Sequence, residues 1–245
     1  MTYIEGFIVP VPEADRDAYV NHARAFAPIG REFGVQRHVE AWESDVPEGK
    51  TTDFRKAVNA HAGEKTVFSW FEYPSREARD AANGKIMSDP RVAGMSDPPF
   101  DGKRMIVGGF QVIVEEGGGR GGYQDGFVLP VLPGKEAAYR AMAAKAAPIF
   151  LEHGAVRVVE AIADDVPHGK ITDFYLAVKA EEGEAVVFSF IEWPDKATRD
   201  TGWRKVMADE RMKPEGDMPF DGPRMFWGGF EPVLDTARSW EPAHA

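Results

Sequence analysis

A tandem repeat constrains the fold of this 245-residue chain more than any other feature of the sequence. When the sequence is shifted by 120 residues, residues 3–115 align without a gap with residues 123–235, and about 51 of the 113 pairs are identical. This period is too long for a solenoid repeat, so we infer the duplication of a whole domain. The expected organisation is a first repeat over 1–116, a Gly-rich linker over 117–122, a second repeat over 123–235 and a C-terminal tail over 236–245.

Each repeat has the same predicted order of elements. The patterns predict strands at residues 3–12, 35–42, 66–73 and 104–114 and helices at residues 13–33 and 75–88. Their counterparts follow 120 residues later, with the first helix of the second repeat over 135–153. The order βαββαβ is the ferredoxin-like arrangement, in which both crossover helices cover one face of the sheet. The other apolar face needs a partner, and the second copy can supply it. We therefore predict an α+β fold in which tandem ferredoxin-like repeats pack sheet to sheet.

The composition is that of a globular protein without disulfides. Hydrophobic residues make up 43% of the chain, and it contains no cysteine. The apolar runs are shorter than the roughly 20 residues of a membrane span, and the N-terminal sequence lacks the pattern of a signal peptide. The net charge of −11 disfavours nucleic acid as a partner. We expect a cytoplasmic protein that binds neither membranes nor nucleic acid.

Several blocks resemble the DUF1428 (YbaA-like) family of bacterial proteins. They are "GFIVPV", "DVPEGKTTDF", "VFSWFEYP", "REARD" and "PFDGKRMIVGGF", and the resemblance covers nearly all of both copies. It implies the dimeric α/β-barrel fold, and because members usually have one such unit, it implies that this chain is a fused dimer. The wider superfamily includes cofactor-free monooxygenases, haem enzymes, lactone isomerases and stress-response proteins, so the resemblance leaves the chemistry open.

Two carboxylates in each repeat are the candidate acid–base groups. Glu40 and Glu72 lie near the ends of apolar strands, and Glu160 and Glu192 are their counterparts. A carboxylate on a buried sheet face would have a raised pKa and could act as a general base or acid. Alternatively, each carboxylate forms an ion pair with a nearby basic group such as Arg37 or Arg104.

The shared loop "DVP.GK.TDF" and the repeated "FDG.RM" phrase supply the candidate ligand-binding residues. The two groups of candidates are Lys50, Asp53 and Arg104 in the first repeat and Lys170, Asp173 and Arg224 in the second. A long ordered loop at the mouth of a barrel is a usual place for ligand contacts. The loop has an equally direct structural interpretation, in which Asp53 caps the segment after it and Phe54 fills the core.

The histidines do not form the spacing of a metal site. Five of the six fall opposite a different residue in the other repeat, the sixth lies in the tail, and neither an HxH nor an HExxH motif occurs. A haem enzyme would need an axial ligand, for which His38 is the only candidate. We expect no metal and no cofactor.

The sequence thus predicts an α/β-barrel that binds a small, partly apolar molecule between a sheet and its helices. It could act on that molecule by cofactor-free acid–base or monooxygenase-like chemistry, with Glu40 or Glu72 as the base and Arg104 stabilising an anion. The alternative is a non-catalytic sensing or stress-related interaction module, and RNA binding ranks last. Differences between the copies, such as Trp70 against Phe190, predict unequal cavities in the two repeats. The chain is expected to be a monomer or a dimer of chains, with the contact between the sheets internal.

Overall fold

A computed structural model describes residues 2–95, 97–214 and 216–237. The first repeat contains β1 (Tyr3–Pro12), η1 (Glu13–Asp15), α1 (Arg16–Glu32), β2 (Arg37–Asp45), α2 (Phe54–Ala57), β3 (Glu64–Tyr73), α3 (Arg76–Ser88), α4 (Pro90–Ala93) and β4 (Ile106–Gly117). The second repeat contains β5 (Tyr123–Val131), α5 (Glu136–Glu152), β6 (Arg157–Asp165), α6 (Phe174–Ala177), β7 (Ala185–Trp193), α7 (Lys196–Ala208), η2 (Glu210–Met212), η3 (Gly222–Arg224) and β8 (Phe226–Asp235). The predicted βαββαβ order is confirmed in both repeats.

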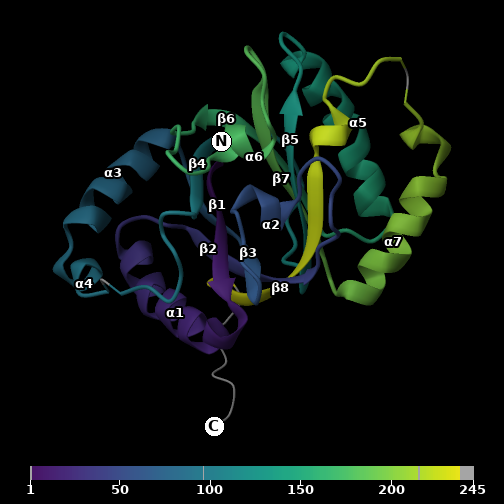
Figure 1. Ribbon diagram of the computed structural model, residues 1–245. Helices are drawn as coiled ribbons and strands as arrows, with labels where there is room; N and C mark the ends of the chain where they lie inside the picture. Colours follow the sequence, from purple (N-terminus) through teal and green to yellow (C-terminus); the bar gives the residue numbers. More distant parts are fainter. Residues whose placement is uncertain (1, 96, 215, 238–245) are drawn as a thin grey trace.

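Within the described residues, the strands form one closed barrel in the order β1-β3-β2-β8-β5-β7-β6-β4. Each repeat contributes four adjacent strands, and the two sheets join edge to edge through the antiparallel pairs β2·β8 and β4·β6. The helices α1 and α3 lie on one side of the barrel, and α5 and α7 lie on the other (Figure 1). Closure of the barrel pairs the edge strands that each sheet would otherwise expose. The two repeats of the predicted fused pseudo-dimer therefore share one continuous sheet.

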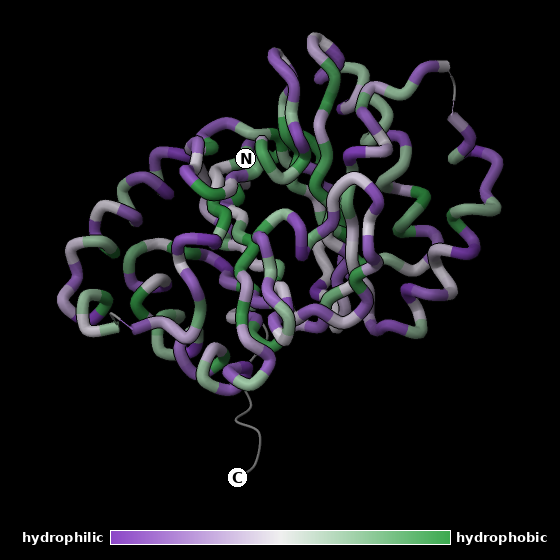
Figure 2. Tube along the Cα trace, viewed as in Figure 1, coloured by the Kyte–Doolittle hydropathy of each residue, from purple (hydrophilic) through white to green (hydrophobic). Residues whose placement is uncertain are grey.

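The interior of the barrel is filled with aromatic side chains from both repeats. Phe68 of β3 stacks on Phe188 of β7 with ring centroids 4.5 Å apart, and Trp70 stacks on Phe190 at 4.2 Å. All four side chains are fully buried. Figure 2 shows the hydrophobic residues concentrated along the central strands and the hydrophilic ones along the outer helices. The barrel interior is therefore a packed core rather than a ligand chamber.

Local signals in the sequence explain where the elements begin and end. The side chain of Ser75 accepts a hydrogen bond from Ala78 N at the start of α3, and Asp195 accepts one from Thr198 N at the start of α7, as predicted. Gly34 and Gly154 follow α1 and α5 with positive φ values of 115° and 107°.

The glycines of the repeated phrase allow close packing inside the last strand of each repeat. A Cβ atom added at Gly109 would collide with the Tyr3 hydroxyl, and one at Gly229 would collide with the Tyr123 hydroxyl. The phrase is therefore part of the framework of each repeat.

The glycine-rich segment 117–122 runs along the second repeat. The amides of Gly119 and Gly122 donate to the carbonyl oxygens of Val156 and Pro194, at 3.1 Å each. Of the tail expected over 236–245, residues 238–245 lie outside the described part. Among the described helices, none has the length and apolar composition needed to cross a bilayer.

Candidate functional site

One end of the barrel is closed by the two "DVP.GK.TDF" loops. Asp53 caps α2 by accepting a hydrogen bond from Lys56 N at 2.7 Å, and Asp173 caps α6 by accepting one from Leu176 N at the same distance. Phe54 and Phe174, which follow the caps, are fully buried in the barrel core. These hydrogen bonds support the structural interpretation, in which Asp53 and Asp173 act as helix caps.

The same loops also hold the two repeats together. The Thr52 hydroxyl donates to the carbonyl oxygen of Ala177 in the other repeat at 2.6 Å, and Thr172 donates to the carbonyl oxygen of Ala57. Lys50 and Lys170, also predicted to bind a ligand, are exposed on the loops. The structure therefore brings neither lysine into an enclosed site.

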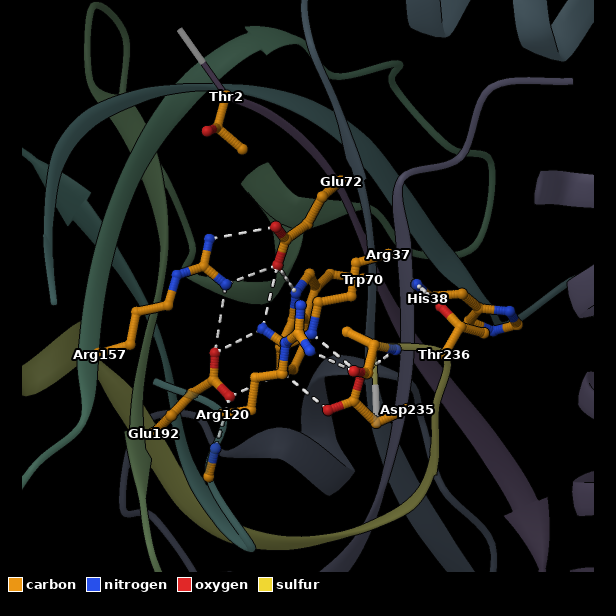
Figure 3. Close-up of polar contacts among 12 residues, drawn as sticks. Thr2, Arg37, His38, Trp70, Glu72, Arg120, Arg157, Glu192, Asp235 and Thr236 are labelled. Carbon is orange, nitrogen blue, oxygen red and sulfur yellow. Dashed lines mark hydrogen bonds and ion pairs between the residues drawn. The ribbon is translucent and has the colours of Figure 1, made fainter. Parts of the chain in front are cut away.

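The other end of the barrel contains a buried ion-pair cluster that joins the repeats (Figure 3). Arg37 makes a bidentate contact with Glu192, with nitrogen–oxygen distances of 2.7 and 2.8 Å. Arg157 makes the corresponding contact with Glu72, at 2.7 and 3.1 Å. Each arginine also reaches the glutamate of its own repeat at 3.3 Å. Two of the candidate bases are therefore paired with arginines, which is the alternative that the sequence left open.

Electrostatics make this cluster unsuited to proton abstraction. Burial raises the pKa of Glu72, but the hydrogen bonds and charge of Arg157, together with the charge of Arg37, outweigh burial and leave the pKa below its usual value. The Trp70 indole also donates to Glu72, at 3.0 Å. All these contacts favour the ionised carboxylate. We therefore interpret the cluster as a structural element that joins the two repeats at this end of the barrel.

Arg104 and Arg224 occupy equivalent positions outside the barrel. Arg104 donates to both carboxylate oxygens of Glu64 at 2.7 Å and to the carbonyl oxygen of Asn59 at 3.0 Å. Arg224 makes the same contacts with Glu184 and Lys179. Each guanidinium thus holds the loop before the third strand of its repeat, and neither side chain lines the cavity described next.

A cavity of about 140 Å³ lies between the outer face of the first sheet and α1. Its lining is mostly aromatic and aliphatic, with four titratable side chains: Phe7, Val9, Tyr19, His22, Ala23, Phe26, His38, Glu40, Ser69, Phe71, Phe100 and Met105. Phe7, Phe26, Phe100 and Met105 are only half-buried, so the cavity adjoins the molecular surface. This position between sheet and helix is the one predicted from the sequence.

A hydrogen-bonded group of three side chains forms the polar wall of the cavity. The Tyr19 hydroxyl donates to Glu40 Oε2 at 2.7 Å, and His38 Nε2 lies 2.6 Å from Glu40 Oε1. Alternation along β2 places His38 and Glu40, which are two residues apart, on the same face of the sheet. Both are almost fully buried, with 2% and 6% of their surfaces exposed. Of the four candidate bases, Glu40 is the one that lines this cavity.

The second ring nitrogen of His38 lacks a hydrogen-bond partner among the described residues. His38 Nδ1 is buried and unpaired. Because Nε2 faces the carboxylate of Glu40, the neutral ring carries its proton on Nε2, which leaves the lone pair of Nδ1 as an acceptor. An unpaired buried polar atom costs about 1–3 kcal/mol, so its persistence requires an explanation.

His22, the second histidine that lines the cavity, lies in an environment that favours its uncharged form. Burial lowers the pKa of His22, against the smaller opposing effect of the Glu40 charge. Burial raises the pKa of Tyr19 well above its usual value, and the neighbouring Glu40 raises it further. At neutral pH, His22 and Tyr19 are therefore both neutral.

The second repeat lacks the histidines at the corresponding place. Val158 and Met142 stand where the first repeat has His38 and His22. Both belong to one continuous hydrophobic cluster, whereas the walls of the first-repeat cavity are divided between two clusters. Glu160 accepts a hydrogen bond from Tyr139 at 2.6 Å. Burial raises its pKa to about 7, against hydrogen bonds from Tyr139 and Ser189.

The sequence points to His38 only as a possible haem ligand, and it does not single out Tyr19 or His22 as members of the site. We chose candidates among polar residues that both repeats share, and that criterion omits His38 and His22, which occur only in the first repeat. The available signal was a histidine two residues before a candidate carboxylate on one strand. No group of three or more His, Asp or Glu side chains within the described ranges could hold a metal ion.

The fold defines the class of protein: an α/β-barrel built from two ferredoxin-like repeats. The chain belongs to the DUF1428 family ("protein of unknown function"), whose model matches residues 2–102 and 122–222. It is 57% identical over 117 residues to the uncharacterised protein YbaA of Escherichia coli K12, a match that covers 47% of this chain and all of YbaA.

Two solved structures have a similar fold. One is a "putative monooxygenase" of Fusobacterium nucleatum, with a TM-score of 0.61 and 9% identity over 96% of this chain and 93% of that one. The other is an anthrone oxidase-like protein, with a TM-score of 0.53 and 12% identity over 100% of this chain and 95% of that one. At these identities the likeness concerns the fold alone.

Proposed function

We propose that the first repeat binds a small, partly apolar molecule in the cavity between the sheet and α1, and that His38 and Glu40 act there as an acid–base pair. The observation that carries this proposal is the buried, unpaired Nδ1 of His38, a residue that lines an apolar cavity of about 140 Å³. A histidine oriented by a carboxylate on its other nitrogen is a common arrangement for a general base.

The proposed step is a proton transfer without a cofactor. The hydrogen of an acidic group on the ligand moves to His38 Nδ1, a new N–H bond forms, and the electron pair of the broken bond stays on the ligand as an anion. The imidazolium that results lies between this anion and Glu40, whose oxygen is 2.6 Å from Nε2. Return of the proton to the same or another atom of the ligand completes an exchange or an isomerisation.

Four of the residues predicted as ligand contacts or bases have other tasks in this proposal. Arg104 and Glu72 stabilise the framework, and so do their counterparts Arg224 and Glu192. Glu40 lines the cavity, and it acts through His38 by fixing the proton on Nε2. Tyr19 is a positioning residue that holds the second oxygen of Glu40.

Oxidation of the bound molecule is a second candidate function. It rests on the names of the two solved structures, a "putative monooxygenase" and an anthrone oxidase-like protein. Removing a proton from a phenol or an enol makes it easier to oxidise, so the same base would serve such a reaction. Oxygen uptake measured with an electrode in the presence of phenol separates this function from simple proton exchange or from ligand sensing.

Binding to the cavity is tested by titrating the protein separately with benzene, toluene and phenol while following backbone amide signals by NMR. We expect saturable shifts confined to α1, β2 and the other walls of the cavity. Ala23→Leu, which fills the cavity from α1, should abolish these shifts, whereas the matched Ala143→Leu in the second repeat should retain them. The proposal fails if none of the three compounds perturbs the cavity residues in the unsubstituted protein.

A further inference from the structure

We infer that the ligand of the first-repeat cavity is a neutral compound with a single planar ring and one hydroxyl donor, that is, a simple phenol; this inference rests on the proposed function. Four properties of the cavity lead to it: its volume, its aromatic lining, its charge and its one unpaired acceptor. Each property excludes a different class of ligand.

The volume limits the ligand to one ring. The cavity measures about 140 Å³, close to the 150 Å³ of an engineered apolar cavity that binds benzene. Molecules with two or three fused rings would extend past the half-buried rim of the cavity into solvent. The apolar surface that stays in water would then add nothing to binding.

The lining favours a flat aromatic ligand. Phe26 and Phe71 stack with ring centroids 5.6 Å apart and an interplanar angle of 14°, and Phe7 packs against Phe71 at 4.9 Å. Phe100 closes the other side, 5.8 Å from the Tyr19 ring. A planar ring would make the offset and edge contacts that aromatic side chains prefer.

The charges disfavour ionic ligands. The described residues that line the cavity include neither lysine nor arginine, so a carboxylate or phosphate would meet the Glu40 charge without a counter-ion. An ammonium group would have to compete for Glu40, whose two oxygens already contact Tyr19 and His38. A neutral ligand avoids both costs.

The unpaired acceptor selects a hydroxyl donor. His38 Nδ1 offers one lone pair and no proton in the tautomer that Glu40 imposes. A phenol hydroxyl donates one hydrogen bond, which satisfies that atom, and its ring then lies among the phenylalanines. The hydroxyl proton is also the acidic one that the proposed transfer would use.

Calorimetric titration of the full chain with phenol, toluene, benzoate and benzylamine tests this class. Phenol should bind about 5- to 10-fold more tightly than toluene, the range expected for one hydrogen bond to a buried acceptor. In His38→Val, which places the residue of the second repeat in the first, phenol should lose this advantage. Toluene should still bind the variant in a saturable way, which shows that the variant is folded.

Two kinds of failure can be told apart. If phenol binds no more tightly than toluene, or if benzoate or benzylamine binds more tightly than phenol, the phenol class is wrong while the cavity remains a binding site. If none of the four compounds binds, the proposed function falls with it.

Discussion

The two repeats share their framework and differ in the space between the sheet and the first helix. Asp53 and Asp173 make the same cap, and Arg104 and Arg224 make the same clamp. By contrast, the first repeat has a cavity lined by two histidines, while Met142 and Val158 belong to a packed cluster in the second. The two histidines are thus confined to the first repeat, and the proposed site is expected in that repeat.

Loss of the buried arginine should lower the free energy of unfolding to a similar degree in either repeat. Arg37→Met removes the bidentate partner of Glu192, and Arg157→Met removes that of Glu72, so that in each case two buried glutamates share the one remaining arginine. We expect each variant to lose about 3–5 kcal/mol of unfolding free energy, measured by urea denaturation. A loss in only one of the two variants would show that the cluster is not symmetric in energy.

The carboxylate of the second repeat should make folding depend on pH. Burial raises the pKa of Glu160 from 4.5 to about 7, so between these values the folded state holds a proton that the unfolded state releases. Stability from this group therefore falls as pH rises from about 4.5 to about 7, by roughly 1–3 kcal/mol. Glu160→Gln should lack this fall, so its stability relative to the unsubstituted protein should increase over that window.

A second variant sharpens this pH prediction. Ser189→Ala removes a hydrogen bond that lowers the pKa of Glu160, so the fall in stability should extend to higher pH. Glu5 and Asp125 also have pKa values raised by burial and contribute a slope of the same sign. The informative quantity is therefore the difference between each variant and the unsubstituted protein. If Glu160→Gln shows the same pH profile as the unsubstituted protein, Glu160 titrates normally.

Replacing the equivalent alanine of α1 and α5 by leucine should destabilise the protein less in the first repeat than in the second. Ala143→Leu adds volume to a continuous hydrophobic cluster and should cost about 1–3 kcal/mol. Ala23→Leu projects into the cavity and should change stability by less than this. Thermal unfolding of the two variants, compared at one pH, measures the difference, and equal losses would mean that the first-repeat cavity cannot accept the added volume.

The sequence predicted the fold because its signals were local and present twice. The βαββαβ order, the caps at Ser75 and Asp195 and the need to cover a bare sheet face all follow from patterns in single repeats. It did not predict that the sheets join through β2·β8 and β4·β6, since strand pairing between repeats depends on the register of edges that are distant in sequence.

The candidate site was predicted less completely than the fold. Glu40 and Glu72 look alike in the sequence, each near the end of an apolar strand. Only the three-dimensional arrangement pairs Glu72 with an arginine of the other repeat and Glu40 with a histidine and a tyrosine of its own. The contacts that distinguish them join residues up to 85 positions apart, which spacing along one chain does not reveal.

Nitrogen-15 NMR of the His38 imidazole can locate the proton on which the proposed base depends. We predict that in the neutral ring of the free protein Nε2 carries the proton and Nδ1 gives the signal of an unprotonated nitrogen. Adding phenol should shift the Nδ1 signal strongly, while the protein in which Ala23→Leu fills the cavity should show no such shift. A proton already bound to Nδ1 in the free protein, or an Nδ1 signal that phenol leaves unchanged, would contradict the proposed base.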